Sequence, residues 1–209
     1  MFILYYPARF LLFLVGALPV SWAAHLGRFF GAIAWRIDKR HRRVSIDNLQ
    51  LVFGKELSRD QIFALAYENY KRVVEAYFSA ICTLQMTDEE LRKHLKISGL
   101  ENIPPRDHPD YGISRVGLIG HFGNFELYAK ASSHLRYLQF STTYRALDNK
   151  LGDRLLATLR SKSNCLFFER RKEGAALKKA MVTQPLLIGF LADQHPGDRG
   201  IWLPFMGVE

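Results

Sequence analysis

Short apolar runs alternate with helical patterns through the second half of this chain, and that alternation limits the fold more than any other feature. The apolar runs that predict strands cover residues 115–120, 138–144, 165–168 and 186–192. The helical patterns between them cover residues 125–135, 148–161 and 174–182. Strands separated by helices form parallel sheets through right-handed crossovers. The sequence therefore predicts an α/β fold, with a mostly parallel sheet flanked by helices.

Helical signals also fill the region before the first of these strands. Ser58 and Gln61 have the spacing of a capping box ahead of a long apolar-periodic run, and Thr87 and Glu90 repeat that spacing ahead of a second helix. Aromatic residues recur along the first helix, and burial tendencies favour the core over an acyl-chain pocket for them. These residues are Tyr70, Tyr77 and Phe78.

The N-terminal region is strongly apolar and predicts a membrane-associated helix. Phe10 to Val20 is apolar apart from Gly16, and this stretch is slightly shorter than the about 20 apolar residues of a spanning helix. Two alternatives remain open. One is a cleaved signal peptide, although the usual positively charged start is missing, and the other is a buried helix pair broken at Pro19. We expect a membrane anchor over residues 1–37, either embedded or interfacial.

Positive charge follows the apolar region directly. The formal net charge of +9 at pH 7 suits nucleic acid, anionic lipid or an acidic protein partner. Nucleic acid is not expected, because zinc-knuckle spacing, RNP-type aromatic motifs and a bZIP-type helix are missing. Juxtamembrane cations instead predict contact with the cytoplasmic leaflet. The first basic cluster contains Arg36, Lys39, Arg40, Arg42 and Arg43, and the second contains Arg170, Arg171, Lys172, Lys178 and Lys179.

The cysteines and histidines predict neither a disulfide nor a metal site. Cys82 and Cys165 are far apart in apolar surroundings, so we expect them to be small buried hydrophobic residues rather than a disulfide or a nucleophile. His108, His121 and His134 are too widely spaced to form a metal-binding pair on one helix.

We expect the catalytic site directly after the first predicted strand, in the segment His121-Phe122-Gly123-Asn124-Phe125-Glu126. Gly123 and Asn124 suit a turn, with Asn124 as the N-cap of the next helix. His121 then stands at the carboxyl end of a strand, where open α/β sheets bind ligands, and Glu126 in the first helical turn can reach back toward it. A first-turn Glu and a strand-end His also occur for structural reasons alone. As a functional site, this pattern would take a proton from a hydroxyl.

Two further polar pairs follow predicted strands. Tyr144-Arg145 and Asp193-Gln194 stand at strand ends, and parallel strands bring their carboxyl ends to one edge of the sheet. We therefore expect both pairs to converge on the edge that carries His121. The alternatives are structural: Asp193 can cap a turn, and Arg145 can be a solvated surface charge.

The six-residue motif resembles the H-x4-D/E motif of the glycerolipid and lipid A acyltransferases. Its particular form is similar to that of the bacterial lipid A biosynthesis acyltransferases, the lauroyl and myristoyl transferases. Further matches follow in the family's order over most of the chain. They are Arg43, Asn48-Leu49 and Phe53, then Tyr144-Arg145, Asn149, Leu151 and Arg160, then Asp193-Gln194 and Pro204-Phe205-Met206-Gly207. Family members continue beyond this last element, so the resemblance implies an acyltransferase domain over residues 38–209 that is shortened at its C-terminal end.

The resemblance implies transfer of a fatty acyl chain from acyl carrier protein, or from coenzyme A, to a hydroxyl of a lipid A precursor or related glycolipid. It places this reaction on the cytoplasmic face of the bacterial inner membrane and requires no cofactor. We predict that His121 is the general base, that Glu126 orients its ring, and that the substrate hydroxyl attacks directly without an acyl-enzyme. The predicted substrate-binding residues are Asn124, Arg145, Asn149, Arg160, Asp193 and Gln194.

Two other functions agree with the same features. Acyltransferases for phosphatidylinositol mannoside, ornithine lipid or aryl polyene have similar motifs, so the acceptor lipid stays open. A basic membrane-binding protein without enzymatic activity would account for the charge but would leave the histidine motif without a role.

Overall fold

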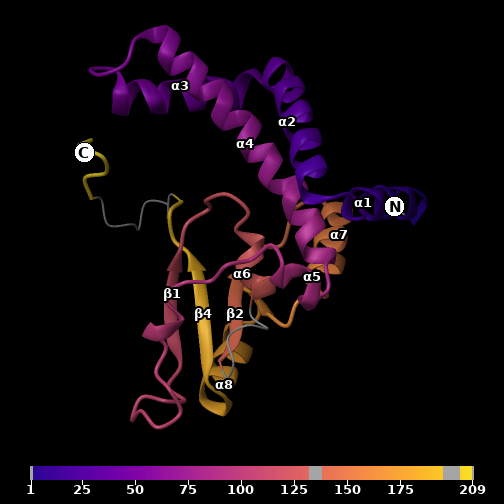
Figure 1. Cartoon of the computed structure of the whole chain (residues 1–209), viewed down its shortest axis with the longest axis vertical. Coiled ribbons are helices and arrows are strands. Elements are labelled where there is room, and N and C mark those ends of the chain that lie inside the picture. The colour runs from indigo at the N-terminus through magenta and orange to yellow at the C-terminus, as the bar shows by residue number, and fades with distance from the viewer. Residues whose placement is uncertain (1, 132–137, 195–202, 209) are drawn as a thin grey trace. The chain divides into compact units, whose positions relative to one another are not determined.

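The computed structural model describes residues 2–131, 138–194 and 203–208. Helices occupy most of the first 92 residues, and strands alternate with helices from residue 115 onward (Figure 1). The chain divides into two compact units. One contains Met1–Leu18 with Ala80–Asp193, and the other contains Pro19–Ser79 with Gln194–Glu209.

Four parallel strands form the sheet of the first unit. They are β1 (Arg115–Ile119), β2 (Gln139–Tyr144), β3 (Leu166–Glu169) and β4 (Leu186–Leu191), in the order β1-β4-β2-β3 (Figure 1). The predicted α/β class and parallel sheet are confirmed, and every predicted strand agrees with the observed one to within one residue at each end. The last connection therefore returns β4 to a position between β1 and β2.

Short helices connect these strands. They are α6 (Glu126–Lys130), α7 (Lys150–Arg160) and α8 (Gly174–Thr183), and a 3₁₀ turn, η1 (Leu100–Asn102), precedes β1. Two of the predicted helices are confirmed as α7 and α8, whereas only the start of the helix expected at 125–135 lies within the described residues. α6 packs against β2, and α8 packs against β3.

One face of the sheet carries the core that positions α6. Ala129 of α6, Phe140 of β2 and Cys165 are buried together. Phe140 pairs in register with Leu187, so both side chains point to the same face, where Leu187 packs against this cluster. Burial of these apolar side chains holds α6 against the sheet.

Both cysteines are free and buried. Burial raises the pKa of the Cys165 thiol to about 12 and also raises the pKa of the Cys82 thiol. A thiol with a raised pKa stays protonated at neutral pH and is a poor nucleophile. The two residues therefore act as small hydrophobic side chains, as the sequence predicts.

The second unit contains α2 (Val20–Ile37), α3 (Lys39–Phe53) and most of α4 (Arg59–Gln85). Buried residues recur every four positions along α2, at Ala23, Gly27, Gly31 and Trp35. The two glycines allow close contact with α4, since an added Cβ would lie 2.7 Å from Glu75 Cα at Gly27 and 2.8 Å from Lys71 Cα at Gly31.

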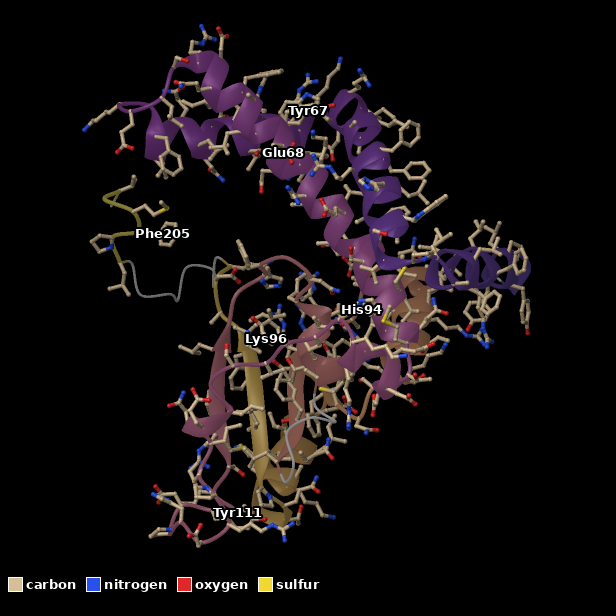
Figure 2. The ribbon with its side chains drawn as sticks, viewed as in Figure 1. Tyr67, Glu68, His94, Lys96, Tyr111 and Phe205 are labelled. Atoms are coloured by element: carbon tan, nitrogen blue, oxygen red, sulfur yellow. The ribbon has the colours of Figure 1, made fainter. Side chains whose placement is uncertain are left out.

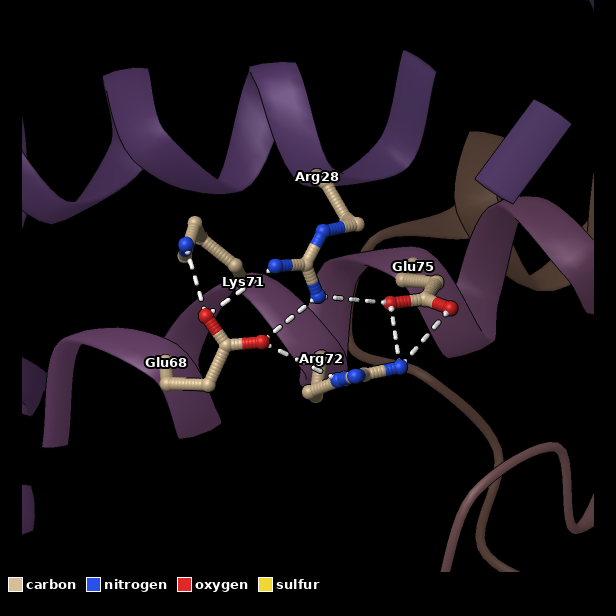
Figure 3. Close-up of polar contacts among 5 residues, drawn as sticks. All are labelled: Arg28, Glu68, Lys71, Arg72 and Glu75. Carbon is tan, nitrogen blue, oxygen red and sulfur yellow. Dashed lines mark hydrogen bonds and ion pairs between the residues drawn. The ribbon is translucent and has the colours of Figure 1, made fainter. Parts of the chain in front are cut away.

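Aromatic and charged side chains complete the α2–α4 contact. The Trp35 ring packs against rings of α4, which belong to Phe63, Tyr67 and Tyr70; Tyr67 and the neighbouring Glu68 are marked in Figure 2. Arg28 forms ion pairs with Glu68 at 2.7 Å and with Glu75 at 3.2 Å (Figure 3). Lys71 and Arg72 bind the same carboxylates from α4 itself.

Both predicted capping boxes are present. Ser58 and Gln61 exchange side chain to backbone hydrogen bonds before α4, and Thr87 and Glu90 do so at the start of α5 (Asp88–Arg92). Of the aromatic residues predicted for the core, two pack against other rings and one is exposed. Tyr70 contacts Trp35 and Phe78 stacks on Phe30, but Tyr77 is 56% exposed because a helix buries only one stripe of its surface.

The N-terminal region forms two helices, α1 (Phe2–Gly16) and α2, with the break at Pro19 that its fixed geometry favours. Among the described residues, no helix combines the length and the apolar character needed to cross a bilayer. α1 packs on α7, where the buried Tyr5 hydroxyl lies 3.1 Å from Thr158 Oγ1. Large apolar side chains on the rest of α1 are exposed, namely Leu4, Tyr6, Phe10, Leu11, Phe13 and Leu14.

Candidate active site

A histidine and an aspartate meet at the carboxyl edge of the sheet. His121 follows β1 and Asp193 follows β4, and these two strands are neighbours in register. His121 Nδ1 lies 2.6 Å from Asp193 Oδ1, and the backbone N–H of His121 donates to Asp193 Oδ2 at 2.6 Å. Both carboxylate oxygens of Asp193 therefore hold His121. For orientation, the opposite, amino-terminal edge of the sheet is the one toward which Tyr111 lies in Figure 2.

This contact determines which imidazole nitrogen is available for chemistry. The hydrogen bond from His121 lowers the pKa of the Asp193 carboxyl, so Asp193 is ionised at neutral pH and can only accept hydrogen bonds. Nδ1 of His121 consequently carries the hydrogen, and the lone pair is on Nε2. The His121 side chain is 27% exposed, and the Phe125 ring contacts it edge to face with the ring centroids 5.0 Å apart. Such an imidazole can accept a proton from a hydroxyl at Nε2.

Glu126 binds a different partner from the one expected. Arg160 at the end of α7 donates from Nε to Glu126 Oε2 at 3.0 Å and from Nη2 to Glu126 Oε1. Both side chains are largely buried, with 10% of Glu126 and 15% of Arg160 exposed. The predicted contact of Glu126 with His121 is thus replaced by a two-point ion pair between α6 and α7. The physical reason is that Asp193 reaches Nδ1 from the adjacent strand, while the start of α6 directs Glu126 toward Arg160.

The turn between His121 and α6 depends on Gly123 and Asn124. Gly123 has a φ of +56°, a left-handed conformation that favours glycine. Asn124 was expected to cap α6, but the N-cap residue is Phe125, without a side-chain cap. The Asn124 amide instead donates to Thr83 Oγ1 at 2.9 Å, and its Oδ1 is buried without a hydrogen-bond partner among the described residues. Asn124 therefore ties the turn to the end of α4.

The remaining predicted binding residues have different surroundings. Asn149 caps α7, since its Oδ1 accepts from the backbone N–H of Leu151 at 2.9 Å. Arg145 is exposed after β2 and lies 3.5 Å from Asp148. Gln194 is exposed and belongs to the other compact unit. The structure thus brings Asp193 into contact with His121, leaves Arg145 open at the same edge, and gives Asn149 a structural contact.

One polar contact behind the motif was not anticipated. The Lys130 ammonium on α6 is buried, donates to the Lys162 carbonyl at 3.1 Å and lies 3.5 Å from Asp88. It anchors the end of α6 as the Glu126–Arg160 pair anchors its start. Sequence spacing carries no signal for this contact, because the partners come from distant segments. Among the described residues, no cluster of three or more His, Cys, Asp or Glu side chains could hold a metal ion.

Comparison with known proteins places the whole chain in one family. The sequence model described as bacterial lipid A biosynthesis acyltransferase matches residues 3–209. No curated protein matches the chain. The family match covers the strand-end motif, the Asp193 strand and the helices before them, in agreement with the resemblance of the separate motifs. The chain therefore belongs to the bacterial lipid A biosynthesis acyltransferases.

Proposed function

We propose that this acyltransferase transfers a fatty acyl chain from a thioester, on acyl carrier protein or coenzyme A, to a hydroxyl of a lipid A precursor or related glycolipid. His121 is the general base and Asp193 is the residue that positions it. The observation that carries this proposal is the Asp193 carboxylate held 2.6 Å from His121 Nδ1 at the carboxyl edge of a parallel sheet. That edge is where open α/β sheets bind their ligands.

The proposed reaction proceeds in one displacement through a tetrahedral intermediate. Nε2 of His121 removes the proton as the acceptor oxygen attacks the thioester carbonyl, and ionised Asp193 stabilises the imidazolium that forms. The carbon–sulfur bond then breaks, the thiolate leaves, and the imidazolium returns its proton to sulfur. An oxygen ester and a free thiol are the products, so His121 is regenerated without an acyl-enzyme.

Glu126 enters this proposal as a positioning residue. Its ion pair with Arg160 joins the start of α6 to the end of α7, and α6 follows directly after the turn that carries His121. Loss of the pair would change where His121 stands without removing a group that contacts the substrate. The proposed task of Glu126 is therefore structural support of the catalytic turn.

The acceptor lipid is reached at a membrane surface. We assign α1 to the interface of the bacterial inner membrane, on its cytoplasmic side, because its exposed face is apolar and the chain carries a net charge of +9. Apolar side chains that enter the headgroup region, together with attraction to anionic lipids, account for interfacial binding of this kind. In this proposal the protein reaches lipid hydroxyls from the membrane surface, and a spanning helix is not required.

Acyl transfer measured with purified protein tests the proposal. Wild type is incubated with acyl carrier protein or coenzyme A thioesters and a lipid A precursor, and the lipid product is identified by mass spectrometry. His121→Ala should lose nearly all transfer while its circular dichroism spectrum and thermal unfolding stay those of wild type. Retention of more than about a tenth of the wild-type rate would exclude His121 as the base, since a general base contributes about 10²-fold or more.

A further inference from the structure

The middle of the turn that carries His121 has little packing around it. The Phe122 side chain is 89% exposed. Apart from its chain neighbours, nothing in the described part of the chain lies within 4 Å of a Cβ built at Gly123. Gly123 also has a left-handed backbone, a conformation that glycine adopts freely but also leaves freely. The conformation of this turn therefore depends on the contacts at its two ends.

Asn124 provides the contact at the α6 end of the turn. Its amide donates to Thr83 Oγ1 at 2.9 Å, whereas at the β1 end Asp193 accepts from the backbone N–H of His121. The residue after Asn124 is Phe125, whose ring contacts the His121 ring edge to face. The position of Asn124 therefore affects both the backbone that leads from His121 and the ring that packs against the imidazole.

Folding alone does not account for the polar groups in this contact. Thr83 is 5% exposed, and its hydroxyl also lies 3.3 Å from the Ala80 carbonyl of its own helix. Asn124 Oδ1 is buried and has no hydrogen-bond partner among the described residues. Burying an unpaired polar atom costs free energy, and buried polar atoms without partners are rare. Valine has nearly the shape of threonine and would fill the place of Thr83 without a polar group, so the hydroxyl indicates a task other than packing.

The end of α4 that carries Thr83 is itself held by α1. Cys82 Sγ donates to the Val15 carbonyl at 3.0 Å, and Gln85 Nε2 donates to the Leu12 carbonyl at 2.8 Å. This part of α4 lies in the same compact unit as α1 and the sheet. The side chains on both sides of Thr83 thus bind a neighbouring helix, and the Thr83 hydroxyl is a fixed point against which the turn can be held.

We propose that Thr83 is a positioning residue of the proposed acyl transfer, because it holds Asn124 and thereby the turn that presents His121. The Thr83 hydroxyl fixes the Asn124 amide, and the Asn124 backbone fixes the start of α6. The imidazole then stays where Asp193 holds Nδ1 and where Nε2 can reach the acceptor hydroxyl. Proton transfer depends steeply on such placement, since a displacement of about 1 Å can cost about 10²-fold in rate. This assignment rests on the proposed function for the reaction but not for the geometry of the turn.

Steady-state kinetics of three variants tests this role. Thr83→Val removes the hydroxyl and keeps the shape, and Thr83→Ser keeps the hydroxyl. Thr183→Val is the matched control, because the Thr183 hydroxyl also contacts a carbonyl of its own helix, at Ala180 and 3.2 Å, but lies at the end of α8. Thr83→Val should lower kcat about tenfold with less than twofold change in KM, since a buried side chain does not touch substrate. Thr83→Ser and Thr183→Val should stay within twofold of wild type in both constants.

Two results of these measurements would overturn the proposal. One is a kcat in Thr83→Val equal to that of Thr183→Val. The other is an equal loss of kcat in Thr83→Val and Thr83→Ser, which would assign the effect to packing rather than to the hydroxyl. All rates are measured well below the melting temperature of each variant, so that only folded protein is compared.

A double-mutant cycle shows whether Thr83 acts through Asn124. If it does, Thr83→Val/Asn124→Ala should have the same kcat as Asn124→Ala, because the contact is already lost in the single variant. Effects on kcat that multiply in the double variant would mean that the two residues act independently, which contradicts the proposal.

Nuclear magnetic resonance tests the turn without the reaction. The signal of the His121 ring Cε1–H group is assigned by its loss in His121→Ala. It should shift or broaden in Thr83→Val and keep its wild-type position and width in Thr83→Ser and Thr183→Val. An unchanged signal in Thr83→Val would contradict the assignment. If this pattern holds while no protein transfers an acyl chain, the proposed function fails and the support of the turn by Thr83 stands.

Discussion

Asp193 and Glu126 are both carboxylates near the turn that carries His121, but they have different tasks because they bind different side chains. Asp193 is ionised and holds the Nδ1 hydrogen of His121, whereas Glu126 neutralises Arg160 in a largely buried ion pair. The first contact determines the chemistry of an imidazole. The second determines whether α6 and α7 stay together.

Substitution of Asp193 should affect the rate and leave the fold intact. Asp193→Asn removes the charge that stabilises the imidazolium and relaxes control of the ring tautomer, so kcat should fall about 10²-fold to 10⁴-fold. Because Asp193 is about half exposed, thermal unfolding should change little. Initial rates and a thermal melt of the same sample check this prediction. A wild-type kcat in Asp193→Asn would show that the carboxylate has no part in catalysis.

Substitution of Glu126 should affect stability first. Glu126→Ala leaves Arg160 largely buried without its partner, which should lower the free energy of unfolding by about 3 kcal/mol. The double variant Glu126→Ala/Arg160→Ala should recover part of that loss, because no uncompensated charge remains. Urea denaturation of the single and double variants gives the coupling energy. The contrary outcome has two parts. The stability losses of the single variants would simply add in the double variant, and Glu126→Ala would lose more kcat than His121→Ala. That outcome would assign Glu126 directly to catalysis.

At the scale of elements, the close contact between α2 and α4 depends on glycines, which have no side chain. A Cβ at Gly31 would lie 2.8 Å from Lys71 Cα, closer than backbone atoms tolerate. Gly31→Ala should force the helices apart and cost about 1–3 kcal/mol, as overpacking does in other cores. Gly174→Ala is the matched control, because nothing lies within 4 Å of a Cβ at that position. In chemical denaturation, the free energy of unfolding of Gly31→Ala should be well below that of Gly174→Ala. Equal stability of the two variants would contradict this description of the contact.

The same helix pair should respond to acid. Hydrogen bonds from Arg28 and Lys71 lower the pKa of the Glu68 carboxyl from 4.5 to about 2. A carboxyl whose pKa is lower in the folded state stabilises the fold above its unfolded pKa and loses this contribution as pH falls through the folded value. Thermal melts from pH 5 to pH 2 should therefore show a shallower decline for Glu68→Gln than for wild type, while the variant is less stable at pH 7. If the melting temperatures of the two proteins instead fall in parallel with pH, the ion pairs of Glu68 contribute nothing to stability.

For the whole molecule, the proposed membrane contact is the exposed apolar face of α1. Phe10 and Phe13 are each 58% exposed on this helix, and inserting a side chain of this size into a lipid interface contributes about 1.5–3 kcal/mol at full burial. Phe10→Ser/Phe13→Ser should therefore reduce partitioning to phosphatidylethanolamine and phosphatidylglycerol vesicles about tenfold or more. Leu118→Ser removes an exposed apolar side chain from β1 and serves as the control. Vesicle sedimentation measures both, and equal partitioning would exclude α1 as the membrane contact.

Features that depend on local interactions were predictable from the sequence. Capping boxes and strand boundaries depend on residues a few positions apart, and the structure agrees with them. The contacts of polar side chains with several possible partners were less predictable. Asn149 was predicted to bind substrate, but in the structure its side-chain oxygen accepts hydrogen bonds from the backbone of α7.

The amino-acid sequence by itself determined the parallel α/β sheet and the position of His121 after its first strand, because these follow from periodicity and from turn residues beside the strand. Only the tertiary structure decided which acid meets the imidazole. Asp193 is 72 residues from His121 along the chain and reaches it because β4 lies beside β1. The nearer Glu126 is drawn to Arg160 instead, since a carboxylate at the buried start of α6 requires a cation that only the packing of α7 supplies.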